Sequence, residues 1–171
     1  MVRGTSLSQK MLQGAVAGLL ATFPMTIFML LAWKRLPERE KYPLPPRLIT
    51  RKLVKQVEPP EELGNTNLTA LTLLLHFLYG AMTGSLYGTL EERIPLHQSV
   101  KGSLYGVSIW SGSYLGWLPA LGILSPATKH PWRRNVLMIA AHVVWGTALG
   151  TFTRLLNAHP LTANQKYIDL E

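Results

Sequence analysis

The chain of 171 residues contains no cysteine, few acids and no charged residue at all across four long stretches. The lack of cysteine excludes disulfides, thiolate metal sites and thiol catalysis. The sequence has 9 acids against 17 lysines and arginines, and the uncharged stretches hold no acid that could form a triad or a carboxylate dyad. No phosphate-binding or dinucleotide-binding glycine loop is recognisable. These absences predict a protein without enzymatic activity.

The four uncharged stretches are the dominant positive feature of the sequence. They cover residues 11–33, 63–90, 102–128 and 135–153. Each reaches the roughly 20 residues that cross a hydrocarbon core about 30 Å thick, whereas a soluble bundle would carry charges on the wet face of every helix. The sequence therefore predicts an all-α integral membrane protein, a single membrane domain over residues 1–171, with four transmembrane helices near 11–33, 69–90, 100–123 and 135–155.

The first stretch also admits an interpretation as a cleavable signal peptide, because Arg3 and Lys10 precede it. It is long for the apolar core of a signal peptide, and Lys34 and Arg35 follow it in place of a small-residue cleavage site. We expect it to stay as a membrane anchor.

Two of the predicted spans carry the same phrase. In each, a histidine is followed by an aromatic residue three positions on and by glycines four and eight positions on: His76, Tyr79, Gly80 and Gly84 in one, His142, Trp145, Gly146 and Gly150 in the other. The other two spans share a weaker pattern of two glycines four residues apart. Since each unit has two spans, both halves keep the same orientation. The sequence predicts two tandem helical hairpins related as a parallel internal repeat.

Glycines that recur every four residues predict the contacts between helices. They form one side of a helix, and in lipid the close approach of backbones at small residues drives helices together. The predicted contact positions are Gly14, Gly18, Gly80, Gly84, Gly88, Gly102, Gly106, Gly146 and Gly150. Gly112 and Gly116 have the same spacing, which extends the prediction, and Gly122 is expected to tolerate a side chain.

His76 and His142 are the only ionisable groups well inside the predicted spans, and polar groups at that depth need a partner. Three roles stay open. Each histidine could be structural and bond a neighbouring carbonyl or a hydroxyl such as Thr72 or Thr147. The pair could serve a proton or ion pathway, with a hydrated cavity lined by Ser99, Ser103, Ser108, Ser111 and Ser113. It could also ligate haem b; otherwise we expect no cofactor and no metal.

The connection over residues 34–68 is proline-rich and holds eight of the lysines and arginines. Within it Ile49, Leu53 and Val57 recur at four-residue intervals, which indicates a helix lying in the headgroup layer, although a solvated basic loop fits equally well. Further on, Trp132, Arg133 and Arg134 have the composition of an interfacial anchor.

The net charge of +8 collects in the segments that flank the spans, which indicates membrane topology and not nucleic-acid binding. The positive-inside rule puts the long loop in the cytoplasm and both termini outside, with cysteines at Thr50 and Asn164 as probes. The expected partners are the lipid bilayer and either other membrane subunits or further copies of the chain.

Three segments together resemble the YagU-like bacterial inner-membrane proteins, a domain of unknown function: Gly14 with Gly18, Leu36-Pro37-Glu38 with Tyr42-Pro43-Leu44-Pro45-Pro46-Arg47, and Ala141-His142-Val143-Val144-Trp145-Gly146. The resemblance implies a multi-pass protein of the bacterial inner membrane and a loose association with acid tolerance, and it brings no catalytic residues. The leading interpretation is a structural or accessory subunit, or a small bundle. The alternatives are a small oligomeric transporter or proton-handling protein that uses His76 and His142, and a bis-histidine haem-binding bundle.

Overall fold

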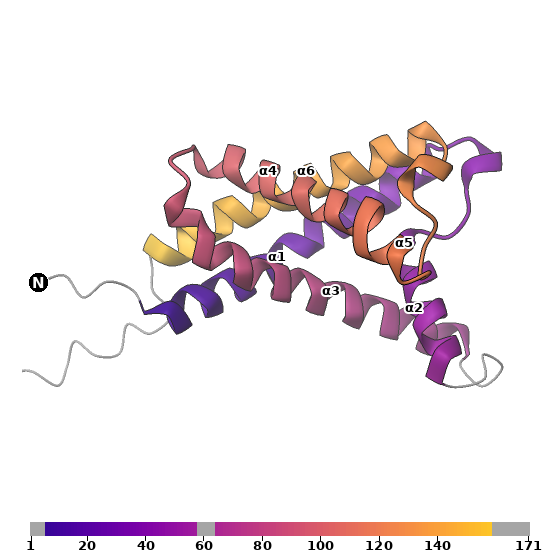
Figure 1. The fold of residues 1–171 in the computed structure, drawn as a ribbon, viewed down its shortest axis with the longest axis horizontal. Coiled ribbons are helices and arrows are strands. Elements are labelled where there is room, and N and C mark those ends of the chain that lie inside the picture. The colour runs from indigo at the N-terminus through magenta and orange to yellow at the C-terminus, as the bar shows by residue number, and fades with distance from the viewer. Residues whose placement is uncertain (1–5, 58–63, 159–171) are drawn as a thin grey trace, which may run out of the picture.

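The computed structural model describes residues 6–57 and 64–158, and this part of the chain consists of helices and their connections, with no strand (Figure 1). Three helices are long and apolar enough to cross a membrane: α1 (Leu7–Lys34), α3 (Asn65–Leu90) with its 3-10 extension η2 (Glu91–Arg93), and α6 (Trp132–Ala158). Their length and composition indicate a membrane protein, as predicted.

The third predicted span is not one uniform helix. Its first part, α4 (Gln98–Ser111), continues into a π-helical segment, η3 (Gly112–Trp117), and ends in a short turn, α5 (Leu118–Ala120). Gly116 has φ −108° and ψ −107°, outside the helical region. Two glycines loosen the backbone here, and Pro119 has no N–H to donate to the preceding turn. At 14 residues, α4 alone is shorter than α1, α3 and α6.

Contacts between residues far apart in the sequence define the two ends of the bundle. We call them the loop end, where residues 38–57 lie, and the turn end, where the short connection of residues 94–97 lies. At the loop end, Arg134 at the start of α6 donates to the backbone oxygens of Glu40 (3.0 Å), Tyr42 (2.9 Å) and Pro43 (3.1 Å), which follow α1. At the turn end, the Gln13 amide near the start of α1 donates to the Leu156 carbonyl at the end of α6, at 3.2 Å. The helical run of α4, η3 and α5 therefore leads from the turn end to the loop end.

Arg134 is buried and does not act as the predicted interfacial anchor. Besides its three backbone bonds, its guanidinium lies 3.5 Å from the centroid of the Tyr42 ring. Two short 3-10 turns, η1 (Glu38–Glu40) and η4 (Ala127–Lys129), accompany it at this end. Trp132 and Arg133 are exposed, and the guanidinium of Arg133 covers the indole ring at 5.0 Å.

The basic segment of the long loop forms a helix, α2 (Pro45–Val57), so the alternative of an irregular solvated loop is wrong. Arg47 ties α2 to the start of α3 by donating to Asn65 Oδ1 at 2.6 Å and to Thr69 Oγ1 at 3.2 Å. The cations further along α2, namely Arg51, Lys52 and Lys55, are exposed. The side chain of Val57, the third member of the predicted apolar stripe, lies outside the described residues.

Glycines set how closely the helices approach. A Cβ added at Gly14 would lie less than 3.0 Å from the Gly84 carbonyl oxygen, and one added at Gly102 would lie equally close to that of Gly146. All nine glycines named above as contact positions meet a neighbouring helix in this way, eight of them at backbone and Gly80 at the Thr22 hydroxyl. The most extensive contacts are those of α1 with α3, α4 with α6, and α1 with α6.

Three other glycines depart from the prediction. A Cβ at Gly112 or Gly116 would meet nothing within 4 Å in the described structure, so extending the contact pattern to these two positions is wrong. Gly122 has φ +64°, a left-handed conformation that side chains disfavour. The expectation that Gly122 tolerates a side chain is therefore also wrong.

We predict that Gly84→Ala lowers the thermal midpoint of the purified protein, while Gly112→Ala leaves it unchanged or raises it slightly. The added methyl at Gly84 would meet the backbone of α1, and overpacking of this kind costs about 1–3 kcal/mol. The methyl at Gly112 has open space and carries the higher helix propensity of alanine. A thermal-shift measurement on both variants in one detergent checks this, and equal midpoints would contradict the packing.

Candidate functional site

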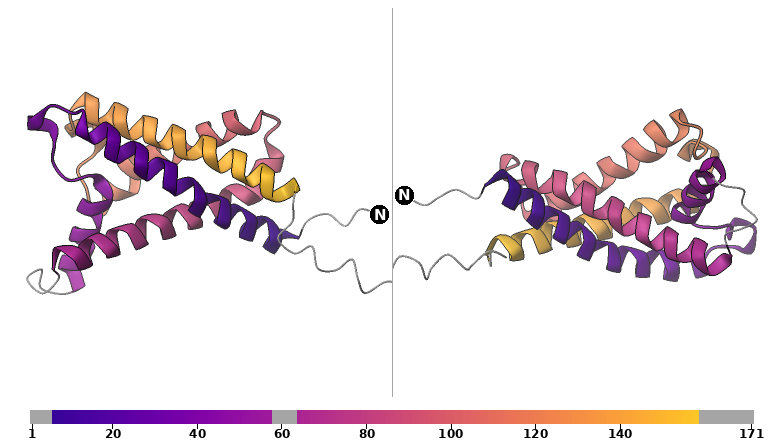
Figure 2. Two further views of the ribbon diagram at one scale, coloured as in Figure 1. Left: turned by 180° about the vertical axis from the view of Figure 1, so that it is seen from behind. Right: turned by 90° about the horizontal axis from the view of Figure 1, so that it is seen from below.

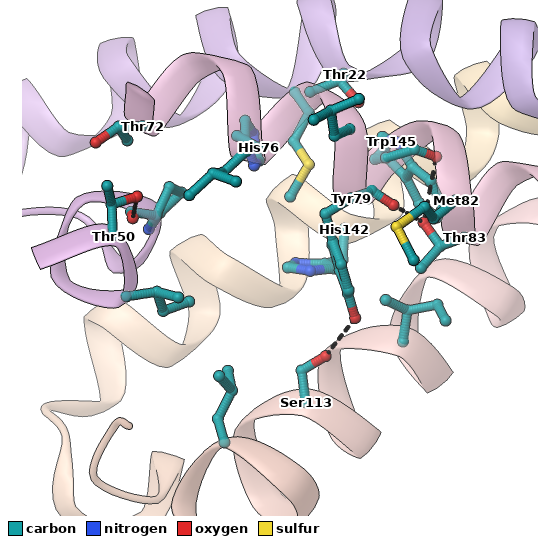
Figure 3. Close-up of a pocket in the computed structure, with 18 of the residues that line it drawn as sticks. Thr22, Thr50, Thr72, His76, Tyr79, Met82, Thr83, Ser113, His142 and Trp145 are labelled. Atoms are coloured by element: carbon teal, nitrogen blue, oxygen red, sulfur yellow. Dashed lines mark hydrogen bonds between the residues drawn. The ribbon is translucent and has the colours of Figure 1, made fainter. Parts of the chain in front are cut away.

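A cavity of about 330 Å³ lies inside the bundle toward its loop end (Figure 3). Its walls come from α1, α3, α6 and the run of α4, η3 and α5, and α2 also contributes to them. Figure 2 shows why there is room: α1 and α3 diverge from their crossing toward the end where α2 lies. His76 and His142, from the two copies of the repeated phrase, both line this one cavity.

His142 projects from α6 and is 6% exposed. Its Nδ1 lies 2.7 Å from the Met138 carbonyl oxygen one turn earlier. Because a carbonyl can only accept, Nδ1 carries the proton of the neutral ring, and Nε2 is left as an acceptor. The Tyr114 ring meets the imidazole edge-on at 6.1 Å. Among the described residues, no hydrogen bond to Nε2 accompanies these contacts.

His76 projects from α3 into the same space and is half-buried (Figure 3). Its Nε2 is buried and has no hydrogen-bond partner in the described structure. The hydroxyls that the sequence suggested as partners are engaged elsewhere. Thr72 donates to the Leu68 carbonyl at 2.7 Å, and Thr147 pairs with Ser103 at 2.7 Å. A structural hydrogen bond is thus found for Nδ1 of His142, and none is found for His76 among the described residues.

The aromatic residues of the repeated phrase line the cavity as well. The Tyr79 hydroxyl is 3.0 Å from the Ser113 hydroxyl and so bridges α3 to η3. The Trp145 indole donates to the Gly18 carbonyl at 3.3 Å and so joins α6 to α1. Of the five serines that could line a hydrated cavity, Ser113 is the one that does.

The rest of the lining is mostly apolar, with Met25 and Met29 from α1 and Ile49 and Leu53 from α2. The sequence predicted that Ile49 and Leu53 share one face of a helix, and in the structure both line the cavity.

The most exposed lining residues are Met82 (71% exposed) and Leu78 (48%) on α3 and Trp117 (41%) on η3. From these residues we infer that the cavity opens on the side of the bundle, between α3 and η3 and beside the Tyr79–Ser113 hydrogen bond.

The two imidazoles offer two nitrogens to a ligand, and no group of three metal-ligating side chains occurs within the described ranges. Haem fits this lining poorly. Its carboxylates would need cationic partners, and no lysine or arginine in the part of the chain that the structure describes lines the cavity. The volume also lies at the lower end of the range for small-ligand pockets, about 300–1,000 Å³.

Residues 35–151 match the family described as "Protein of unknown function (DUF1440)". The chain belongs to this family. The resemblance to YagU-like proteins is consistent with it, and the matched region includes both histidines and most of the cavity lining outside α1. Neither a curated protein nor a solved structure matches the chain.

A second polar centre, at the turn end, was not anticipated from the sequence. Lys101 and Glu91 form an ion pair of 2.7 Å, with side chains 5% and 4% exposed. Lys101 also donates to the backbone oxygen of Glu91 at 2.6 Å, and Asn157 donates to the Glu91 carboxylate at 2.9 Å. Nothing local in the sequence shows that residues ten positions apart close into a buried contact.

We predict that Lys101→Met strongly destabilises the protein and that the double variant Lys101→Met, Glu91→Gln recovers much of the loss. The single change leaves a buried carboxylate without its cation, which typically costs about 3–5 kcal/mol, whereas removing both charges is close to neutral. Lys10→Met is the matched control, because Lys10 pairs with Glu92 at the surface. The denaturation midpoints of these three variants test the prediction. A double variant no more stable than Lys101→Met would show that the pair is not what holds this end together.

Proposed function

We propose that the protein is a non-catalytic, four-span membrane protein that binds the apolar chain of an amphiphile in the cavity between α3 and η3. One observation carries this proposal: a largely apolar cavity whose most exposed lining residues, Leu78, Met82 and Trp117, lie on the side of the bundle. Burial of apolar surface is the main source of affinity for such a ligand. The polar groups of the lining are uncharged hydroxyls and imidazoles, which suits an uncharged or weakly polar occupant.

Four spans are supported by the direction of the chain. The helical run over residues 98–120 covers roughly 34 Å at 1.5 Å per residue, enough for a hydrocarbon core. It starts beside Glu91 at the turn end. The segment that follows it lies at the loop end, where the Tyr42 hydroxyl is 2.8 Å from His130 Nδ1. A helix that stayed on one side of the membrane would not join these two ends.

Two hairpins are supported by the glycine contacts. Gly14 and Gly18 of α1 meet the glycines of α3, and Gly102 and Gly106 of α4 meet those of α6. The two arrangements differ by one helical turn, because Gly106 packs on the His142 carbonyl whereas Gly18 packs on that of Gly80. The hairpins thus use one kind of contact in two registers, as diverged copies of one unit would.

The proposed location is the bacterial inner membrane, with the bilayer as the first partner. The basic loop and α2 lie in the cytoplasm by the positive-inside rule. Within this frame the protein serves as an accessory that holds or presents its ligand, alone, as a homo-oligomer or beside other membrane subunits.

A proton- or ion-handling role would use the same histidines. We favour binding over it because, within residues 6–57 and 64–158, the acids that such a pathway would need do not line the cavity. The buried carboxylate of Glu91 lies at the turn end and is already paired with Lys101.

The topology predicts which single cysteines share a side of the membrane. Thr50 is buried and unsuitable as a probe, and Asn164 lies outside the described residues. We choose the exposed positions Lys52, Arg93 and Thr128 in their place.

In intact cells an impermeant maleimide should label Arg93→Cys and spare both Lys52→Cys and Thr128→Cys, while all three react after lysis. Labelling of Thr128→Cys together with Arg93→Cys would show that the third helical run does not cross the membrane.

Filling the cavity should displace the ligand. Leu75→Trp puts an indole into the cavity lining, while its neighbour Leu74 is 56% exposed and does not line the cavity, so Leu74→Trp is the matched control. We expect mass spectrometry to find an amphiphile retained after detergent exchange by the wild type and by Leu74→Trp, and lost by Leu75→Trp. Equal lipid content in all three proteins would refute binding in this cavity.

A further inference from the structure

The proton of His142 restricts what its other nitrogen can bind. Nδ1 donates to the Met138 carbonyl at 2.7 Å, so Nε2 of the neutral ring offers a lone pair. The side chain is 94% buried, since 6% of it is exposed, and it projects into the cavity (Figure 3). An acceptor that faces an apolar cavity without a donor costs free energy. The group that completes this site must therefore carry an O–H or N–H.

The surroundings restrict the charge of that group. Among the described residues, no lysine, arginine, aspartate or glutamate lines the cavity, so a charged headgroup would lose its hydration without gaining an opposite charge. The hydroxyls of Tyr79 and Ser113 bond each other, and this pair keeps one undonated proton that an uncharged headgroup can accept. His76, which lines the same cavity, lies beside this uncharged headgroup.

The shape of the site restricts the rest of the ligand. The histidines stand within the bundle, and the opening past Leu78, Met82 and Trp117 is apolar and faces the bilayer. A ligand with its headgroup on the imidazoles would run its chain out through this opening. The reverse orientation would put a chain against His142 Nε2 and leave the acceptor unpaired.

We propose that the occupant is an uncharged, hydroxyl-bearing amphiphile whose O–H donates to His142 Nε2 and whose apolar chain leaves between α3 and η3. This assignment rests on the proposed binding function and names its ligand class. The main rival is an anionic lipid with its chain in the cavity and its headgroup on the exposed cations of α2, Arg51 and Lys52.

Four compounds with one chain length separate the headgroups: dodecanol donates and accepts, its methyl ether only accepts, dodecanoate is anionic, and dodecane has no headgroup. Each is titrated as a mole fraction of detergent into the purified full-length protein, with the thermal midpoint as the readout. Partition into micelles then affects every variant alike. We expect dodecanol to bind about fivefold more tightly than its ether, the effect of one net hydrogen bond.

Two variants test whether His142 causes the preference for dodecanol over its ether. His142→Leu should abolish the difference between dodecanol and the ether while the dodecane shift remains, which shows that the cavity is still formed. His142→Gln should keep part of the difference, because an amide oxygen can accept the same hydroxyl. Arg51→Gln with Lys52→Gln should leave the preference unchanged.

The outcomes are distinguishable. Equal shifts from dodecanol, ether and dodecane in the wild type would overturn the headgroup assignment and leave chain binding intact. So would a donor preference that survives in His142→Leu. A strongest shift from dodecanoate that disappears in the α2 variant would overturn it in favour of an anionic lipid. No shift from any compound, together with no lipid retained on purification, would defeat the proposed function itself.

Discussion

Direct backbone contact at glycines is the constraint on which the rest of this structure depends. In lipid, helices gain little from hiding apolar surface, so dispersion between closely approaching backbones has to hold them. Gly14 and Gly18 against the glycines of α3, and Gly102 and Gly106 against α6, provide that approach. These contacts lie toward the turn end. Beyond Gly80 the larger side chains Met25 and Met29 face the interior, the helices separate, and the cavity occupies the resulting space.

The two hairpins are joined unequally, and this places the cavity on one side. α1 packs closely against α6, and Trp145 donates across that contact to Gly18. In a symmetric pair of hairpins, α4 would pack against α3 in the same way. Instead, side chains bridge that gap, such as Tyr105 donating to the Thr83 carbonyl at 2.7 Å. The repeated phrase therefore puts His142 in a closed environment and His76 near an open one.

The sequence predicted the features that depend on helical periodicity. Spacing of four residues identifies a helix face whatever the partner, so the contact glycines could be named in advance, and an uncharged run of over 20 residues marks a membrane helix. The repeat drew attention to His76 and His142, but it did not predict that both line one cavity. Features set by long-range contacts were not accessible. Neither the burial of Arg134 against the Glu40 loop nor the closure of Glu91 on Lys101 has a local signal.

Two features that the sequence did not reveal have a common physical origin. Gly112 and Gly116 have the spacing of a contact face, and the apolar stripe of α2 has the pattern of an interfacial helix. Periodicity reports that a face exists, but not what covers it. The π-helical turn directs Gly112 and Gly116 away from the neighbouring described helices. Arg47 holds α2 against α3 by its hydrogen bond to Asn65, so that Ile49 lines the cavity.

The unpaired nitrogens of the histidines connect the stability of the bundle to its occupancy. A buried acceptor without a partner costs roughly 1–3 kcal/mol, and an apolar cavity adds to that cost through lost dispersion contacts. Tight glycine contacts at the turn end are able to offset such a cost at the loop end, because the two regions share α1, α3 and α6. A ligand that supplies a hydroxyl and a chain would relieve both the unpaired acceptor and the lost dispersion contacts. Any molecule that binds only the folded state stabilises that state by mass action. Under the proposed function, the stability of the loop end therefore depends on which amphiphiles the surrounding membrane supplies.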